Sequence, residues 1–456
     1  MIEGLKPYPD YRESGLRLVG RVPKHWDVKR AKTLFREVDD RSDTGTEELL
    51  SVSHISGVRR RSELNATMFL AKSNKGHKLC RANDLVINTM WAWMGALGVS
   101  PHAGLVSPAY GVYRPLDTVR LLPTYVHQVL RSPAYVAEFT IRSTGIHSSR
   151  LRLYPEQFLR LPLLLPPRDE QGAIVRFLDH ANHRIDRYVR AKRKLISLLD
   201  EQKRAIIHRA VTRGINPNVP LKESGVPWLG KVPAHWHATR VKNEFQCLNS
   251  RRIPLSATER GEMVLRKHAY YGASGVIDKV DDYLFDDDLI LIAEDGANLV
   301  LRNLPLAIIA RGKFWVNNHA HILKPRRGNL EYLAGLLETI SYRPWITGAA
   351  QPKLTKDRLL AVAVCLAPRA EQDAIMKYVA DETAPLRQSI ERVGREVALF
   401  REYSIKLASD VVSGQLDVRD VVSRLPIEEH EPSALTDVEQ DAVTNAEEEL
   451  ERGVGA

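Results

Sequence analysis

The sequence has few cysteines and no long hydrophobic run. Its three cysteines, Cys80, Cys247 and Cys365, are far apart and form no C-x-x-C pair, which argues against a disulfide framework and against a structural zinc site. No stretch approaches the ~18 apolar residues that a membrane helix needs. The longest apolar run, Leu359 to Ala367, fits a buried strand. The first residues carry no signal-peptide core. We therefore expect a cytoplasmic protein with no membrane partner.

Common catalytic motifs are also missing. The sequence contains no G-x-x-x-x-G-K-[ST] phosphate loop, no G-x-S-x-G elbow and no H-E-x-x-H zinc motif. It also lacks the Asn-Pro-Pro-aromatic motif and the glycine-rich cofactor loop of amino-methyltransferases. We therefore expect no intrinsic catalysis, no metal site and no cofactor in this chain.

The charge distribution is uneven. The chain has 456 residues, which is too long for one hydrophobic core, and a net charge of +10. Residues 427–456 hold ten acidic residues and one basic residue, so the remaining chain carries +19. A body this basic suits a polyanion such as DNA, because binding would release condensed counterions. The acidic segment is expected to be a disordered tail.

The sequence contains an internal repeat. Residues 11–35 and 221–245 are identical at eleven of 25 positions when they are aligned at an offset of 210. The repeated segments share G-x-V-P-x-H-W, at 20–26 and 230–236. A second pair, P-R-x-E-Q-x-A-I, begins at Pro167 and Pro368. The residues between these motifs have diverged, which indicates a duplicated frame around two variable regions.

A helical pattern follows each P-R-x-E-Q motif. Apolar residues recur at three- to four-residue spacing, as in a coiled-coil seam. In the first copy they are Ile174, Leu178, Ala181, Ile185, Tyr188, Leu195, Leu199 and Ile206. In the second they are Leu386, Ile390, Val393, Val397, Phe400, Leu407 and Val411. Gly214 and Gly414 fit helix ends, and Pro385 is expected to begin or kink the second helix.

Two such helices should pack on each other. Each is about 40 residues and about 60 Å long at 1.5 Å per residue. Because the second variable region begins where the first helix ends, an antiparallel pair with a pseudo-two-fold axis needs no long return of the chain. The alternative is two separate amphipathic helices, each covering its own domain. The antiparallel pair is favoured, and it predicts an α+β protein with two globular domains joined by two long helices.

These ordered pairs of motifs resemble the specificity subunit of type I restriction-modification systems over residues 11 to about 424. The resemblance implies two target recognition domains, each reading one half of a bipartite asymmetric DNA target. It also implies that the helices set the gap and dock methyltransferase subunits, two per chain, with a restriction endonuclease-translocase completing the complex. S-adenosylmethionine, ATP and Mg would then belong to those partners, and the base modified would be adenine at N6.

The resemblance also predicts domain boundaries. The expected segments are recognition domain 1 at 1–167, spacer helix 1 at 168–214, recognition domain 2 at 215–367, spacer helix 2 at 368–424 and the acidic tail at 425–456.

The variable regions supply candidate DNA-contacting residues, chosen for basic, aromatic or amide side chains in expected loops. In the first region they are Arg59, Arg60, Arg61, Lys72, Lys75, Lys78, Trp91, Trp93, Ser148, Ser149, Arg150 and Arg152. In the second they are Arg251, Arg252, Arg266, Lys267, Asn317, Asn318, His319, Gln351 and Lys353. The segments after Thr144-Gly145 and Thr347-Gly348 occupy equivalent places, so they are the favoured DNA-facing loops.

Several of these features allow a second interpretation. Trp26 and Trp236 could stack on bases, but packing against a helix end is favoured. The aromatic run from Met90 to Met94 fits either an exposed contact or the core. Asp286–Asp288 with Glu294 and Asp295 could suggest a nuclease; a turn followed by a strand is favoured, because Asn88 and Thr89 stand in the comparable stretch of copy one.

Two other functions compete with the specificity subunit. One is a stand-alone bipartite DNA-binding regulator, which would bind DNA tightly without partners. The other is a coiled-coil scaffold with no nucleic-acid role, which leaves the net charge of +19 unexplained.

Overall fold

The computed structural model describes residues 4–64, 73–145, 151–226, 228–348 and 351–426. The expected roles of four residues, Lys72, Ser148, Ser149 and Arg150, lie outside the described residues, and so does most of the predicted acidic tail, from 427 onward. The chain divides into two compact units: unit 1 comprises Met1–Lys192 and Glu396–Ala456, and unit 2 comprises Arg193–Arg395. Each unit is described by itself below.

Unit 1 is built around a four-stranded antiparallel sheet in the order β4-β11-β8-β9. Its strands are β4 (Phe35–Val38), β11 (Gly111–Pro115), β8 (Leu85–Ile87) and β9 (Leu97–Val99). The central strand β8 is apolar throughout and fully buried, as strands covered on both faces are. The helices α1 (Pro123–Leu130), α2 (Pro133–Arg142) and α3 (Pro155–Leu159) contribute their apolar faces to the same core.

Unit 1 also contains short paired strands. These pairs are β1 (Tyr11–Glu13) with β2 (Arg21–Pro23), β3 (Asp27–Arg30) with β12 (Pro162–Leu165), β5 (Leu50–Ser53) with β6 (Gly57–Arg60), and β7 (Lys78–Cys80) with β10 (Gly104–Val106).

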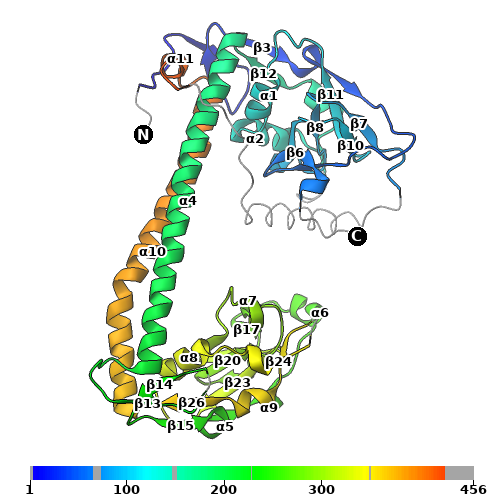
Figure 1. Cartoon of the computed structure of the whole chain (residues 1–456). Coiled ribbons are helices and arrows are strands. Elements are labelled where there is room, and N and C mark those ends of the chain that lie inside the picture. Colours follow the sequence, from blue (N-terminus) through cyan, green and yellow to red (C-terminus); the bar gives the residue numbers. More distant parts are fainter. Residues whose placement is uncertain (1–3, 65–72, 146–150, 227, 349–350, 427–456) are drawn as a thin grey trace. The chain divides into compact units, whose positions relative to one another are not determined.

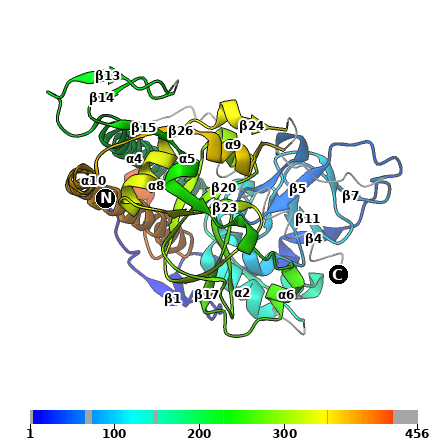
Figure 2. The ribbon, with the colours of Figure 1, turned by 90° about the horizontal axis from the view of Figure 1, so that it is seen from below.

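Unit 2 repeats the sheet of unit 1 in the order β16-β23-β20-β21. Its strands are β16 (Phe245–Cys247), β23 (Ala320–Pro325), β20 (Leu289–Ala293) and β21 (Ala307–Ala310). Phe245 pairs with Pro325 in unit 2, as Phe35 pairs with Pro115 in unit 1. Each residue of the second pair lies 210 positions after its counterpart in the first. The frame strands are repeated as well: β15 (His237–Arg240) lies beside β26 (Ala363–Leu366), as Figure 2 shows. The two diverged regions therefore keep one topology.

The registers correct one detail of the sequence alignment. By sequence, residues 83–87 resemble residues 287–291, which aligns Leu85 with Leu289. In the structure Leu85 pairs with Tyr113, whereas Leu323, the counterpart of Tyr113 at the offset of 210, pairs with Ile290. Leu85 is therefore equivalent to Ile290, and Thr89 to Glu294. The cause is that runs of buried aliphatic residues carry no alternation from which sequence could fix a strand's register.

Unit 2 also contains a second sheet, in the order β18-β17-β22-β19. The strands are β17 (His268–Gly272), β18 (Gly275–Val280), β19 (Phe285–Asp286) and β22 (Lys313–Val316). Phe285 and Phe314 stack within it at 5.6 Å between ring centroids. This sheet has its own apolar core, which includes Leu248 and Leu289.

The remaining elements of unit 2 are short. They are β13 (Leu221–Glu223), β14 (Lys231–Pro233), β24 (Ile346–Thr347), β25 (Lys353–Leu354), α5 (Val241–Glu244), α6 (Ala257–Gly261), α7 (Asn298–Leu301), α8 (Leu330–Thr339) and α9 (Lys356–Ala361). The run Leu359–Ala367 was expected to be one buried strand, which is wrong in part: it begins within α9, and only Ala363–Leu366 forms β26. Among the described residues no helix is long and apolar enough to cross a membrane.

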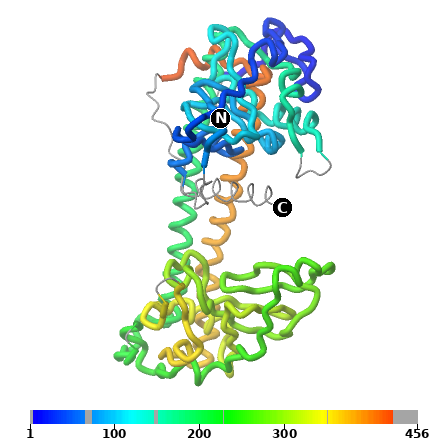
Figure 3. The backbone as a smooth tube through the Cα atoms, turned by 90° about the vertical axis from the view of Figure 1, so that its right-hand side faces the viewer, coloured from blue at the N-terminus to red at the C-terminus, as the bar shows by residue number. Residues whose placement is uncertain are grey.

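Two long helices, α4 (Arg168–Arg213) and α10 (Arg369–Val412), lie side by side, green and orange in Figures 1 and 3. In unit 1 the beginning of α4, at Ile174, shares a core with the end of α10, at Val411. In unit 2 the end of α4, at Val211, shares a core with the beginning of α10, at Ile375. The pair is therefore antiparallel, and the predicted α+β fold with two long packed helices is confirmed.

Pro385 does not begin the second helix, as the sequence had allowed. It lies inside α10, which starts at Arg369. The helix continues because its flanking turns are held by packing: Val379 on one side and Val393 on the other are buried.

The helix seam is apolar at its ends and mixed farther along in unit 1. Ile174, Leu178 and Ala181 are at most 1% exposed. Farther along, Tyr188 stacks on Phe400 with 5.8 Å between ring centroids, and Lys192 pairs with Glu396 at 2.7 Å. Asn182 accepts a hydrogen bond from Ser404 at 2.9 Å. Polar pairs of this kind specify register at some cost in stability.

Candidate nucleic-acid interface

Each unit holds its globular part to a long helix through one repeated contact. In unit 1 the indole N–H of Trp26 donates to Glu170 at 2.9 Å, and His25 lies 2.8 Å from the same carboxylate. In unit 2 Trp236 and His235 contact Glu371 at 3.1 and 2.7 Å. Both tryptophans are 1% exposed, so they pack against a helix start, as the favoured interpretation held. They are not free to stack on bases.

The helix ends fit against these tryptophans. Gly414, two residues beyond α10, adopts a positive φ of 74°, and a Cβ there would lie 2.3 Å from Pro23 Cδ and 3.1 Å from Trp26. Gly214, directly after α4, has the same φ and faces Trp236 and Glu371. Both glycines therefore occupy the helix-end position predicted from sequence.

In unit 1 the segment after α10 also binds the N-terminal segment of the described chain. The backbone N–H of Asp417 donates to the Lys6 carbonyl at 2.7 Å, and the Gln415 side chain donates to the Arg21 carbonyl at 2.7 Å. The short helix α11 (Arg419–Val422) lies beside the N-terminal segment (Figure 1).

The described ends of the two favoured DNA-facing loops lie at equivalent places in the two sheets. In unit 1 Thr144 pairs with Arg152, and the next residue, Leu153, donates its N–H to the Thr89 carbonyl at 2.8 Å. In unit 2 Thr347 pairs with Lys353, and Leu354 donates to the Glu294 carbonyl, also at 2.8 Å. Each loop is thus anchored to the end of the same central strand. Arg152, Gln351 and Lys353 are exposed.

In unit 2 the strand end carries a charged network. Glu294 accepts from Arg252 at 2.6 Å and lies 3.5 Å from Lys353 and 3.6 Å from the buried His321. Burial alone would raise the pKa of Glu294, but the hydrogen bond from Arg252 and the neighbouring positive charges hold it below its usual value. The network thus joins two of the predicted residues, Arg252 and Lys353.

The neighbouring residues extend this network. Asp295 lies 2.8 Å from the exposed His319, and the buried Asn317 accepts the His319 N–H at 2.8 Å. Asn318 is exposed, and its carbonyl accepts from Arg252 at 3.1 Å. Among the described residues no group of three or more His, Cys, Asp or Glu side chains is placed to hold a metal ion.

The equivalent strand end of unit 1 is uncharged. Asn88 donates to the Tyr110 hydroxyl at 3.1 Å, and Thr89 donates to the Ala109 carbonyl at 2.9 Å. The same scaffold position therefore carries acidic and basic groups in one unit and neutral amide and hydroxyl groups in the other.

The aromatic candidates of unit 1 are half-buried. Trp91 and Trp93 stack with 5.7 Å between ring centroids, around the short 3-10 helix η3 (Ala92–Met94). Trp93 donates to the Met90 carbonyl at 3.0 Å, which fixes its ring. Both residues therefore keep part of their surface exposed to solvent.

The basic candidates of unit 1 differ in exposure. Arg59 and Arg60 end strand β6, and Arg61 follows in the 3-10 helix η2 (Arg61–Glu63); Arg60 is exposed and the others are half-buried. Lys75 is exposed. Lys78, expected in a loop, instead lies in strand β7; it is 8% exposed and pairs with Asp39 at 3.4 Å.

The remaining basic candidates of unit 2 are mostly held by neighbours. Arg251 lies over the Phe285 ring at 4.7 Å and donates to the Leu284 carbonyl. Arg266 pairs with Asp278 at 3.4 Å, while its N–H donates to Asp281. Lys267 is exposed.

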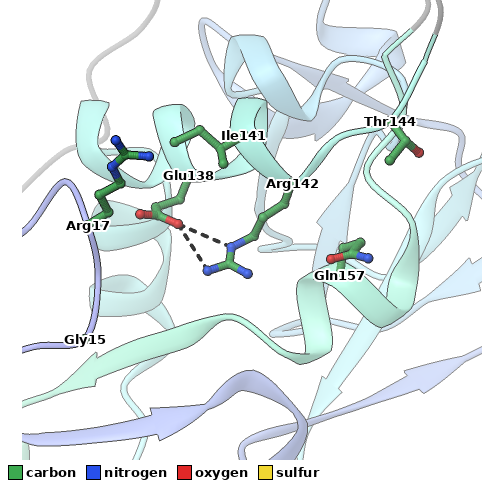
Figure 4. A pocket seen from close by; sticks show the side chains of 7 residues that line it. All are labelled: Gly15, Arg17, Glu138, Ile141, Arg142, Thr144 and Gln157. Carbon is green, nitrogen blue, oxygen red and sulfur yellow. Dashed lines mark hydrogen bonds and ion pairs between the residues drawn. The ribbon is translucent and has the colours of Figure 1, made fainter.

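A cavity of about 480 Å³ lies in unit 1, between the N-terminal loop and α2 (Figure 4). Sequence reasoning missed it. It is lined by Gly15, Arg17, Glu138, Ile141, Arg142, Thr144 and Gln157. Glu138 pairs with Arg142 at 3.2 Å through one oxygen, and its other oxygen is buried without a donor among the described residues. That oxygen is closed off from the cavity's solvent, so it offers no direct contact for a ligand.

Comparisons with known proteins agree with this architecture. No protein-family model matches the chain. A type I restriction enzyme specificity subunit from Haemophilus influenzae is 32% identical over 139 residues, which is 30% of this chain and 34% of that protein. The match thus spans about a third of the relative's own length. The predicted resemblance to type I specificity subunits is confirmed over that stretch.

Solved structures share the fold. One similar chain comes from a structure that describes the complex assembly and conformational transition of a type I R-M system. It has a TM-score of 0.55 at 15% identity, and the match covers 86% of this chain and 98% of that one. The HsdS subunit from Thermoanaerobacter tengcongensis has a TM-score of 0.40 at 16% identity, with the same coverage. The first of these shows a common fold.

Proposed function

We propose that this chain is the DNA-specificity subunit of a type I restriction-modification complex and has no catalytic activity of its own. Each unit would read one half of a bipartite asymmetric target. The observation that carries this proposal is that two loop ends, Thr144 with Arg152 and Thr347 with Lys353, are anchored in the same way to strand ends of different chemistry. A common scaffold with different side chains at its edge suits the reading of two unlike sequences.

The long helices would act as the spacer and as the docking surface for methyltransferase subunits, two per chain. At 1.5 Å per residue, a helix of 46 residues such as α4 is about 70 Å long. Two-fold DNA-binding proteins usually contact half-sites that are one helical turn of DNA, about 34–36 Å, or a multiple of it apart. A rigid spacer of this length therefore suits two half-sites separated by a fixed gap. S-adenosylmethionine, ATP and Mg would be bound by the methyltransferase and endonuclease-translocase partners, which would methylate adenine at N6 and cleave DNA.

The net charge of +19 over residues 1–426 supports a DNA partner. Phosphate contacts from this surface would make binding depend steeply on salt. The stand-alone regulator makes the same prediction, so partner dependence is what separates the two proposals. The scaffold without a nucleic-acid role predicts no such binding.

The test is to co-express the chain with a type I methyltransferase subunit and to map modified bases across the host genome. The proposal predicts one split motif with a constant gap, present only when both proteins are expressed. Modification without this chain, or at a continuous motif, would contradict it. Tight, sequence-specific DNA binding by the purified chain alone, with no effect on modification, would favour the regulator.

A further inference from the structure

Arg131 binds the carbonyl groups of two separate segments of unit 1, 53–55 and 95–97. It is the residue directly after helix α1. Its Nη1 donates to the carbonyls of Leu97, Ser53 and Gly95 at 2.8, 3.3 and 3.4 Å, and its Nη2 donates to those of His54 and Ile55 at 2.8 Å each. A planar guanidinium with a fork of donors suits this set of acceptors, which a lysine ammonium could not span.

The Arg131 charge is balanced by carbonyl dipoles. Among the described residues it forms no ion pair with a carboxylate, and burial lowers its pKa to about 10. The Arg131 guanidinium therefore remains protonated at neutral pH, and the five carbonyl groups stabilise its buried charge. Loss of the side chain would leave those acceptors without their donor.

Two glycines make room for this junction. Gly57 of β6 has a φ of 73°, and a Cβ there would lie 2.7 Å from the ring of His127 and 3.4 Å from Arg131. A Cβ on Gly98 of β9 would lie 3.1 Å from the same ring. The hairpin β5–β6 and strand β9 therefore approach α1 closely at this point.

The segments joined by Arg131 carry candidate DNA contacts. Residues 53–55 run from the end of β5 into the turn of hairpin β5–β6, whose second strand leads to Arg59, Arg60 and Arg61. Gly95 directly follows η3 and Leu97 begins β9. Of the stacked pair, Trp91 directly precedes η3 and Trp93 lies within it. The basic hairpin and the aromatic segment are thus tied to one side chain.

Unit 2 has the opposite charge at the equivalent position. The side chain of Gln171 accepts the N–H of Leu122, the residue before α1. Its counterpart Gln372 accepts the N–H of Asn329, the residue before α8. Leu122 and Asn329 are therefore equivalent, so α1 and α8 align at an offset of 207. Position 131 therefore corresponds to Glu338. Its carboxylate accepts the N–H groups of Leu306 and Ala307, at the start of β21, at 2.7 and 2.8 Å. Strand β21 is the counterpart of β9, so in both units this helix position is bonded to the edge strand, by a donor in unit 1 and by an acceptor in unit 2. Glu338 also pairs with Arg302 at 3.1 Å.

We propose that Arg131 is a positioning residue for DNA reading by unit 1, which fixes the basic hairpin relative to the aromatic segment. This inference rests on the proposed function. Glu338 has the corresponding role in unit 2. Neither residue contacts DNA in this account; each sets the geometry of the side chains that do.

The test uses the full chain co-expressed with its methyltransferase, and variants Arg131→Lys, Arg131→Met and Glu338→Gln. The readout is the methylation rate at cognate sites divided by the rate at sites with one mismatch, measured separately for each half of the motif. Arg131→Lys should lower this ratio about tenfold for one half and leave the other within about twofold, in line with the loss of one well-placed base contact. Glu338→Gln should reverse the two halves.

Controls separate positioning from a general loss of folding. Arg120→Met alters an arginine whose side chain is 69% exposed and should change neither ratio. The amount of methyltransferase that co-purifies reports assembly. If Arg131→Met does not assemble, Arg131→Lys and Gly98→Ala, which crowds His127 at the same junction, decide the question. Equal losses in both halves, or no loss in either, would overturn the inference. A wild-type chain that directs no split motif would instead overturn the proposed function, before any variant is compared.

Discussion

Trp26 donates its indole N–H to the carboxylate of Glu170 at 2.9 Å, which holds the first globular part of the chain to the start of helix α4. Trp236 and Glu371 make the same contact in unit 2 at 3.1 Å. The two carboxylates differ in their surroundings. Glu170 also accepts from the Tyr8 hydroxyl and its side chain is 4% exposed, whereas that of Glu371 is 24% exposed.

This difference predicts unequal costs for one substitution. Glu170→Ala leaves buried donors of Trp26 and Tyr8 unpaired and should lower the free energy of unfolding by about 3 kcal/mol. Glu371→Ala should cost about 1 kcal/mol, because water can reach the freed donor. Denaturant titration gives the magnitudes, and hydrogen exchange assigns each loss to its unit. Equal losses would show that the two contacts are energetically equivalent, against this account.

The helix-end glycines should also respond unequally. Both Gly214 and Gly414 have a φ of 74°, where a side chain costs roughly 1–2 kcal/mol. Gly214→Ala should cost about that much, since its nearest neighbour at 3.0 Å is the flexible end of Glu371. Gly414→Ala should cost about 1–3 kcal/mol more, because its Cβ would overlap the rigid ring of Pro23. Thermal unfolding of the two variants side by side checks the order, and a larger loss for Gly214→Ala would contradict it.

Helix α10 should gain stability when Pro385 is replaced. Proline inside a helix removes one hydrogen bond and costs about 3 kcal/mol relative to alanine. Pro385→Ala should therefore raise the free energy of unfolding, by about 1–3 kcal/mol. Denaturant unfolding measures the change. No gain, or a loss, would mean that the helix depends on the proline at this position.

The Glu294 network predicts a pH dependence of stability in unit 2. The pKa of Glu294 is depressed in the folded state, since Arg252, His321 and Lys353 outweigh the opposing effect of burial. Its contribution is therefore complete above the unfolded-state pKa of about 4.3 and is lost as pH falls through the lower folded-state value.

Glu294→Gln isolates this contribution. The wild-type chain should exceed the variant in stability at pH 7, and the difference should shrink below about pH 4.3. Unfolding curves of both proteins between pH 3 and pH 7 test this. A difference that stays constant over the whole range would show that the carboxylate's charge has no stabilising role. Asp286→Asn, at an exposed residue of β19, is the matched control.

Much of the frame follows from the sequence because duplication repeats it. The helices after Pro167 and Pro368, their antiparallel packing and the stops at Gly214 and Gly414 all follow from repeated residues and apolar spacing. Even the partner of Trp26 carried a signal, because His25, Trp26 and Glu170 all have counterparts in the second copy. Polar residues retained together in two otherwise diverged copies suggest mutual contact.

Other features gave no such signal. The sequence alignment of β8 with β20, its counterpart in unit 2, was wrong by one residue, because both strands are uniformly apolar. The second sheet of unit 2 could not be inferred, because its strands have diverged in sequence from the corresponding strands β6, β5, β10 and β7 of unit 1. Pro385 lies inside a helix because tertiary packing overrides its local preference. Arg131 belongs to no recognisable motif, and its five acceptors come from residues 34 to 78 positions away, so only the fold brings them together.

The central claim is that the two units read separate halves of one target. The frame contacts suggest where to exchange sequence: residues 31–160 can be replaced with those of a relative, keeping His25, Trp26 and the pairing of β3 with β12. The reciprocal exchange replaces residues 241–361. Genome-wide mapping of modified bases should show that each exchange changes one half of the split motif, a different half in each case, with the gap unchanged. If either exchange altered both halves, or neither, the two units would not be independent readers.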